Sequence, residues 1–184
     1  MALTPANMIP LGTLAPGFAL PDTVSGNNLS LLDLRGEKAT VVMFICNHCP
    51  YVNHINPELV KLANDYLPKR IKFIAISSNN VLSQPEDSPE KMKEVASKEK
   101  YPFPYLYDES QQVAKLYDAA CTPDFYIFNE EMKLVYRGQL DDSRPSNKVP
   151  LTGRDIRAAL DSIVSDKEVS PFQRPSIGCN IKWK

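Results

Sequence analysis

The chain has 184 residues, of which 43% are hydrophobic and 23% are charged, a size and composition that suit one globular domain with its own core. Its 21 basic and 22 acidic side chains leave a formal charge of -1, too weak a field to attract nucleic acid or an anionic membrane. With no stretch long enough to span a membrane, no leader-like pattern at the start and four cysteines, too few for a secreted disulfide scaffold, we expect a soluble, cytoplasmic protein.

The first third of the chain predicts a hairpin, a buried strand and a long helix. Residues 15–22 lead to a turn at 25–28, and the leucine-rich segment 29–34 predicts a second strand and a short helix. The apolar run over 39–45 is typical of a strand that is buried on both faces. Helical spacing begins at Pro50, a residue suited to a first helical turn, so Cys49 is predicted to lie at a helix N-terminus.

The rest of the chain predicts alternating strands and helices followed by an irregular tail over residues 169–184. Strands are expected over 71–77, 103–107, 124–128 and 133–137, and helices over 89–100, 110–117 and 152–165. The last two strands form a hairpin. This order predicts a sheet with helices on both faces, largely parallel and closed by an antiparallel hairpin strand.

Cys49 is the candidate nucleophile, because the amide groups and dipole of a helix N-terminus favour a thiolate over a thiol. His48 precedes it and would stabilise the thiolate when protonated. Cys46, three residues earlier, is near enough to attack a mixed disulfide on Cys49 if the turn permits. We therefore expect a partly exposed cysteine of low pKa with a nearby resolving thiol. The alternative is a pair of reduced cysteines that pack as small hydrophobic residues.

Three segments, Ala15–Asp22, Phe44–Pro50 and Thr122–Phe128, resemble the thioredoxin-like redoxin and peroxiredoxin superfamily. The segment from Cys46 to Val52 and the closing residues 176–183 are similar to those of peroxiredoxin-like thioredoxin-family proteins. The resemblance implies an α/β thioredoxin-like fold, with a mixed central sheet flanked by helices, an N-terminal hairpin extension and a C-terminal tail. It implies a redoxin domain over residues 1–168 and a tail over 169–184 that packs on it.

The segment around Cys49 departs from the cysteine patterns of both thioredoxin-like reductases and peroxiredoxins. Thioredoxin-like reductases carry their second cysteine three residues after the first, where this chain has Val52. Peroxiredoxins carry a threonine or serine shortly before the nucleophile, with a proline ahead of it and a partner arginine, and residues 44–49 do not supply that pattern. We predict a thiol-disulfide oxidoreductase, with a thiol peroxidase as the second reading and a non-catalytic binding module as a third.

Thr122 and Pro123 look like the threonine and cis-proline of thioredoxin folds, which implies a cis bond and a backbone edge that pairs with an extended substrate. An ordinary proline at a strand entry is the alternative. In this fold Cys121 lies near Cys49, which makes it either a candidate resolving thiol or a buried structural one. Cys179 in the tail is a second candidate, because prolines and a glycine favour an extended path there and apolar residues offer anchors, so that the tail could fold back onto Cys49. A tail thiol without a partner is the alternative.

Cofactors and metals are not predicted. The seven glycines are scattered, and none belongs to a phosphate-cradling Gly-x-Gly-x-x-Gly motif. A zinc site remains an alternative, but no second short-spaced cysteine pair supports it. Its ligands would come from Cys46, His48, Cys49, Cys121 and Cys179. The expected partners are a protein or small-molecule disulfide or a peroxide, and a thiol reductant that supplies electrons.

Overall fold

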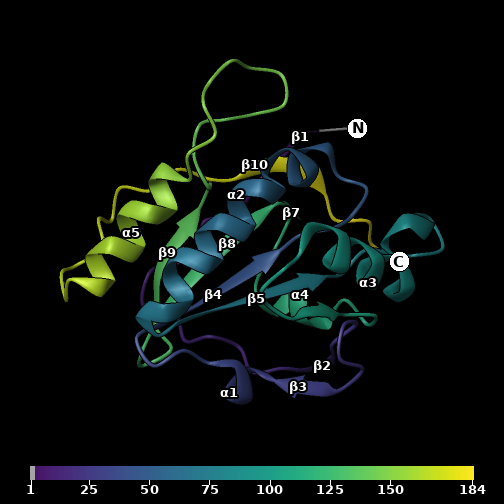
Figure 1. Cartoon of the computed structure of the whole chain (residues 1–184), viewed down its shortest axis with the longest axis horizontal. Coiled ribbons are helices and arrows are strands. Elements are labelled where there is room, and N and C mark those ends of the chain that lie inside the picture. Colours follow the sequence, from purple (N-terminus) through teal and green to yellow (C-terminus); the bar gives the residue numbers. More distant parts are fainter. Residues whose placement is uncertain (1–2) are drawn as a thin grey trace.

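The computed structural model describes residues 3–184 (Figure 1). Its central sheet has five strands in the order β6-β5-β4-β8-β9. These strands are β4 (Ala39–Phe44), β5 (Ile71–Ser77), β6 (Tyr105–Tyr107), β8 (Asp124–Asn129) and β9 (Leu134–Gly138). β4, β5 and β6 run parallel, whereas β8 is antiparallel to both β4 and β9. The sheet is therefore mixed and every predicted strand is present, which confirms the predicted α/β class.

β4 is buried along its whole length because helices cover both faces of the sheet. Val41 and Met43 face the core that contains α2 (Pro50–Tyr66), α3 (Pro89–Glu99) and α5 (Arg154–Val164). Val42 and Phe44 point the opposite way, toward α4 (Gln112–Leu116), because successive side chains of a strand alternate between faces. In Figure 1, α2 crosses the sheet and its first turn lies near the tail strand.

The N-terminal hairpin extension also forms as predicted. It consists of β2 (Ala19–Pro21), paired antiparallel with β3 (Asn28–Ser30), and the short helix α1 (Leu31–Leu34). The side chain of Ser30 accepts the backbone N–H of Asp33, and Asp33 accepts the backbone N–H of Ser30 in return. This reciprocal capping box explains why so short a helix begins at this point.

The tail is not irregular, so that part of the prediction is wrong. It contains β10 (Ile177–Asn180), the middle strand of a three-stranded antiparallel sheet between β1 (Leu3–Pro5) and β7 (Cys121–Thr122). Strands of two to four residues show no alternating pattern, and their pairing depends on segments far apart in the chain. The division of the chain into residues 1–168 and a tail over 169–184 stays a prediction.

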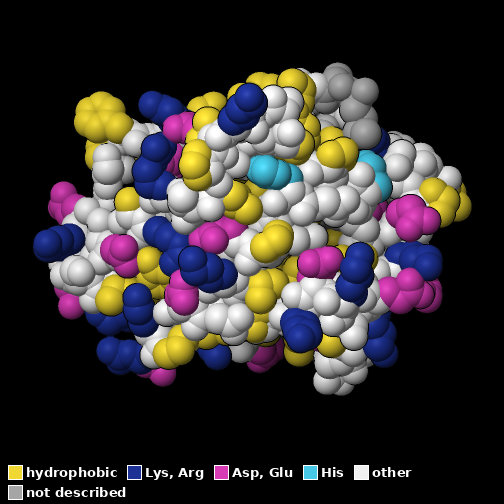
Figure 2. All heavy atoms as spheres, turned by 45° about the horizontal axis from the view of Figure 1, so that its top comes forward, with side chains coloured by type: hydrophobic (Ala, Val, Ile, Leu, Met, Phe, Trp, Pro, Cys, Tyr) yellow, Lys and Arg dark blue, Asp and Glu magenta, His cyan; other side chains and the backbone are white. Residues whose placement is uncertain are grey.

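Charges of both signs are interspersed over the face in Figure 2, which also displays both histidines. None of the helices within residues 3–184 is long and apolar enough to cross a membrane. Two short 3-10 helices complete the described elements, at Leu67–Lys69 and Pro85–Asp87. The second of them borders the segment that leads from β4 into α2.

Candidate functional site

Three cysteines and one threonine meet where β4 ends and α2 begins. The Sγ atom of Cys49 lies 3.0 Å from the Sγ atom of Cys179 and 3.2 Å from the carbonyl oxygen of Thr122. The Sγ atom of Cys46 lies 3.2 Å from the Oγ1 atom of Thr122. None of the four cysteines forms a disulfide bond. The fold thus brings together four of the residues that the sequence singles out, from a loop, a helix start and two strands.

The first residue of α2 is Pro50, and Cys49 is its N-cap, as predicted. Its surroundings lower the pKa of the Cys49 thiol to about 5, chiefly through a hydrogen bond from the Cys46 thiol. The Cys179 thiol and the backbone N–H groups of Val52 and Cys179 contribute further, and together these donors outweigh burial, which acts in the opposite direction. Cys49 is therefore a thiolate at neutral pH that accepts hydrogen bonds from its neighbours.

The two neighbouring cysteines have the opposite tendency. Burial raises the pKa of the Cys46 thiol well above its ordinary value. Burial, together with the hydrogen bond to Cys49, raises the pKa of the Cys179 thiol to about 12. Both residues therefore keep their protons at neutral pH, and the site holds one thiolate between two thiols. In this arrangement Cys49 is the candidate nucleophile, and the two protonated thiols are its hydrogen-bond donors.

The exposure of Cys49 differs from the sequence prediction. A partly exposed nucleophile was expected, but the side chain of Cys49 is 0% exposed. Cys179 is also buried, because β10 runs along β7 and places this residue directly over the helix start. The sequence does not indicate that the tail covers Cys49, because the tail has no recognisable strand pattern. A reagent therefore needs a local opening of the structure to reach the sulfur of Cys49.

His48 does not have the predicted role. Its Nδ1 atom lies 2.6 Å from the Oδ2 atom of Asp87, and no contact joins its ring to the sulfur of Cys49 among the described contacts. The ring is thus engaged by a carboxylate on the 3-10 helix at Pro85–Asp87. The donors that lower the pKa of Cys49 are thiols and backbone amides instead.

Asp87 is the main residue that sequence reasoning missed. Its Oδ1 atom accepts the backbone N–H groups of Asn47 and His48 at 2.7 and 3.1 Å. Its Oδ2 atom accepts the side-chain N–H of Asn79 at 2.8 Å and faces His48. Burial alone would raise the pKa of Asp87, but these hydrogen bonds lower it below its ordinary value. The ionised carboxylate thereby fixes the turn that precedes Cys49, and no local motif marks it in the sequence.

A metal ion is the other chemistry that these side chains suggest. Ligand atoms of Cys46, His48 and Asp87 lie within 4.8 Å of one another, while Cys49, Cys121 and Cys179 do not belong to the group. The carboxylate oxygens of Asp87 already serve two backbone N–H groups, Asn79 and His48. Binding a cation would disrupt the bonds that hold the turn, so the donor set fits a hydrogen-bond network better than a metal centre.

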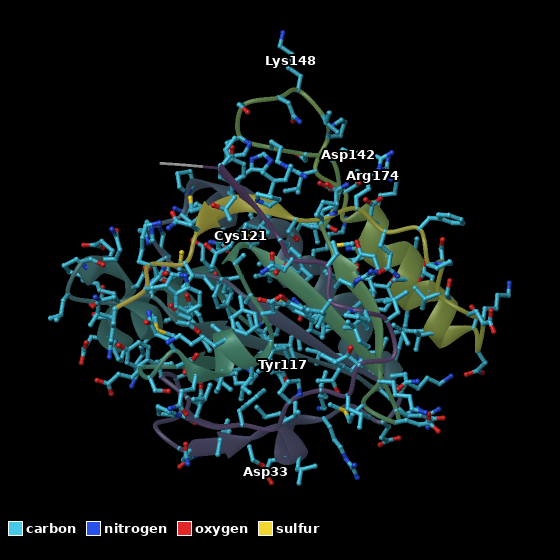
Figure 3. All side chains as sticks on the ribbon, turned by 180° about the vertical axis from the view of Figure 1, so that it is seen from behind. Asp33, Tyr117, Cys121, Asp142, Lys148 and Arg174 are labelled. Carbon is cyan, nitrogen blue, oxygen red and sulfur yellow. The ribbon has the colours of Figure 1, made fainter. Side chains whose placement is uncertain are left out.

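The peptide bond between Thr122 and Pro123 is cis, as predicted. Thr122 directs its side chain toward Cys46, whereas the described hydrogen bonds of Cys121 do not include the sulfur atoms of Cys46, Cys49 or Cys179. The Sγ atom of Cys121 lies 3.9 Å from the carbonyl oxygen of Pro123, and burial raises the pKa of this thiol. Figure 3 labels Cys121 beside the tail strand.

Comparisons with known proteins identify relatives of this chain. The sequence model of the AhpC/TSA family matches residues 11–137. A Mycobacterium tuberculosis (strain H37Rv) protein named "Putative peroxiredoxin" is 31% identical over 117 residues, which is 64% of this chain and 69% of that protein. An uncharacterized conserved protein from Geobacillus kaustophilus has a crystal structure that is 60% identical, with a TM-score of 0.99 over 100% of this chain and 97% of that one.

A more distant structure defines the fold. The thioredoxin domain of a thiol-disulfide oxidoreductase from Bacteroides vulgatus superposes with a TM-score of 0.60 at 22% identity, over 74% of this chain and 91% of that one. At this level of identity the likeness concerns the fold alone. The predicted thioredoxin-like fold is therefore confirmed, with its mixed central sheet and flanking helices.

Proposed function

Because the chain belongs to the AhpC/TSA family, we propose that it is a thiol-disulfide oxidoreductase in which Cys49 is the nucleophile and Cys179 the resolving cysteine. The observation that carries the proposal is the 3.0 Å contact between the two sulfur atoms. A disulfide bond is about 2.05 Å long, so only a small movement separates the two thiols from a bond. The low pKa of Cys49 supports the assignment of the nucleophile.

The proposed cycle begins with a disulfide substrate. The Cys49 thiolate attacks one sulfur atom, a mixed disulfide forms, and the other substrate sulfur leaves as a thiolate. The Cys179 thiol then loses its proton to that thiolate and attacks the Cys49 sulfur, which releases the second substrate sulfur as a thiolate that takes a proton from water. The products are a Cys49–Cys179 disulfide and two reduced substrate thiols. An external dithiol or two monothiols return the enzyme to the reduced state and become a disulfide themselves.

The neighbouring residues support this chemistry without forming bonds to the substrate. Cys46 donates a hydrogen bond to the Cys49 thiolate and is itself held by the side chain of Thr122. The carbonyl oxygen of Thr122 accepts a hydrogen bond from Cys49 in its thiol form at 3.2 Å. Pro123 follows at the end of the same short strand, β7. In this proposal, Cys46, Thr122 and Pro123 position the nucleophile and its resolving partner.

Cys179 is a better resolving residue than the other two cysteines. The sulfur of Cys121 contacts the carbonyl oxygen of Pro123 at 3.9 Å, and no described hydrogen bond joins it to the sulfur of Cys49. Cys46 serves as a hydrogen-bond donor to Cys49, and burial raises its pKa well above the ordinary value. Cys179 alone combines a direct sulfur contact with Cys49 and a place on a separate strand, β10.

A peroxide is the second candidate oxidant, favoured by the family and by the relative named as a peroxiredoxin. Here the Cys49 thiolate attacks one peroxide oxygen, the O–O bond breaks, and a proton converts the departing oxygen to an alcohol or water. Cys49 becomes a sulfenic acid. The Cys179 thiol then condenses with it, releasing water and forming the same Cys49–Cys179 disulfide. Both candidates therefore share one resolving step.

The titration of Cys49 tests the assignment of the nucleophile. The ultraviolet absorbance of the thiolate should rise as the pH increases through about 5, the pKa of Cys49, because hydrogen bonds favour its charged form. Its reaction with a small oxidant should follow the same curve and stay constant between about pH 6.5 and 8, where an ordinary cysteine, with a pKa of about 8.5, would still gain reactivity. The variant Cys49→Ser is the control and should lack the low-pH step. A single titration near pH 8.5 would contradict the assignment.

A further inference from the structure

The strand β7 carries Thr122 next to the nucleophile, and the tail strand β10 occupies its edge. β10 pairs antiparallel with β7, with Cys179 opposite Thr122 and Asn180 opposite Cys121. The backbone N–H of Ile181 extends the ladder to the carbonyl oxygen of Ala120 at 3.1 Å. An unpaired strand edge binds extended peptides through its free N–H and C=O groups. Here the chain's own tail already uses those groups.

The register of the tail is the register that a bound cysteine peptide would adopt. Pairing with Thr122 directs the side chain of Cys179 onto the sulfur of Cys49. Gly178, the preceding residue, packs so closely that a Cβ atom there would overlap the carbonyl oxygen of Thr122 and lie 3.2 Å from Pro123. The strand therefore lies against the edge only because this position has no side chain. The tail behaves as an internal substrate, with its cysteine at the reacting position.

Contacts on both sides hold the tail in place. β1 pairs with the other edge of β10, so the tail is the middle strand of its sheet. Beyond Cys179, Ile181 is buried, and the carbonyl oxygen of Lys182 accepts the backbone N–H of Asn80 and the side-chain N–H of Gln111, both at 2.8 Å. The backbone N–H of Lys182 donates to Asn79, which also binds Asp87. The tail and the turn before Cys49 thus share one hydrogen-bond network.

We propose, building on the oxidoreductase function above, that β10 restricts Cys49 to small-molecule oxidants, because it fills the edge that a protein disulfide would need. A protein disulfide must supply an extended segment on each side of its cysteine, and that segment competes directly with residues 177–181. A low-molecular-weight disulfide or a peroxide needs no such pairing, so a brief local opening suffices. Release of β10 therefore converts the enzyme into one that also accepts protein disulfides.

Gly178→Ala tests this directly, because the added methyl group cannot fit against Thr122 and forces β10 from the edge. The matched control is Gly17→Ala, where an added Cβ atom meets nothing within 4 Å. The single-turnover rate of Cys49 modification is measured with hydroxyethyl disulfide, hydrogen peroxide and insulin as oxidants. The wild type and the control should react with the two small oxidants and only slowly with insulin. In Gly178→Ala, the rate with insulin should rise by at least about tenfold. This corresponds to a tenfold increase in the fraction of molecules in which β10 has left the edge.

Hydrogen exchange of the backbone amides of residues 177–181 reports whether the tail has been released. Ile181→Ala is a second variant that loosens the same strand from beyond Cys179 and leaves the glycine unchanged. Released tails without a gain in the insulin rate would overturn the inference, and so would a wild type that reacts with insulin as fast as with hydroxyethyl disulfide. A wild-type Cys49 that reacts with none of the three oxidants would instead refute the proposed oxidoreductase function.

Discussion

We expect that replacing Cys49 by serine will abolish turnover with both disulfides and peroxides. A serine hydroxyl is not ionised at neutral pH, so the reacting anion is lost while Cys46, Thr122 and Cys179 stay in place. Loss of a nucleophile costs on the order of 10³-fold or more in kcat. The measurement is the steady-state rate with hydrogen peroxide or hydroxyethyl disulfide as oxidant and dithiothreitol as reductant.

The matched control for this loss is Cys121→Ser. Cys121 is equally buried, but its sulfur contacts the carbonyl oxygen of Pro123 and has no described hydrogen bond to the sulfur of Cys49. Its replacement should leave the rate within about threefold of wild type, the scatter expected for a conservative change outside the reacting groups. Full activity in Cys49→Ser, or a loss in Cys121→Ser as severe as that in Cys49→Ser, would show that the nucleophile has been assigned wrongly.

Replacing Cys179 by serine separates the two halves of the proposed cycle. The serine hydroxyl still donates a hydrogen bond to Cys49, so the thiolate and its first reaction with oxidant should persist. The resolving step is lost, and turnover should fall by roughly 10²-fold because a dilute external thiol replaces a neighbouring one. With hydrogen peroxide, Cys49 should accumulate as a sulfenic acid. Intact-mass measurement with a sulfenic-acid probe follows this species.

The comparison variant for this second change is Cys46→Ser. It keeps a hydrogen-bond donor beside Cys49 and preserves the contact with Thr122. If Cys179 resolves, this variant should complete the cycle without accumulating sulfenic acid. The reverse pattern, with accumulation in Cys46→Ser and normal turnover in Cys179→Ser, would make Cys46 the resolving cysteine.

The central sheet could be predicted from the sequence because its strands carry strong local signals. The apolar run that forms β4 and the helical spacing from Pro50 to Tyr66 each exceed one structural period, so β4 and α2 were located with little error. The strands β1, β7 and β10 were not predicted. Each has only two to four residues, and their hydrogen bonds join the two ends of the chain to a segment in its middle. No local sequence pattern indicates such pairings.

The sequence predicts only those parts of the candidate site that lie beside elements with strong local signals. Cys49 and Pro123 stand beside recognisable elements, and their positions at a helix start and a cis bond were expected. The burial of Cys49 and the role of Asp87 were not, since both depend on segments that meet only in the folded chain. The prolines, glycine and apolar residues of the tail make Cys179 a candidate from the sequence. Its direct contact with Cys49 depends on the pairing of β10 with β7.

Disulfide mapping of the wild-type protein after one equivalent of oxidant is the most direct test of the Cys49–Cys179 cycle. The protein is treated with hydrogen peroxide or hydroxyethyl disulfide, its remaining thiols are alkylated, and the unreduced peptides are identified by mass spectrometry. The cycle predicts one disulfide between Cys49 and Cys179, with Cys46 and Cys121 alkylated as thiols. A disulfide between Cys49 and either Cys46 or Cys121, or four intact thiols, would contradict it.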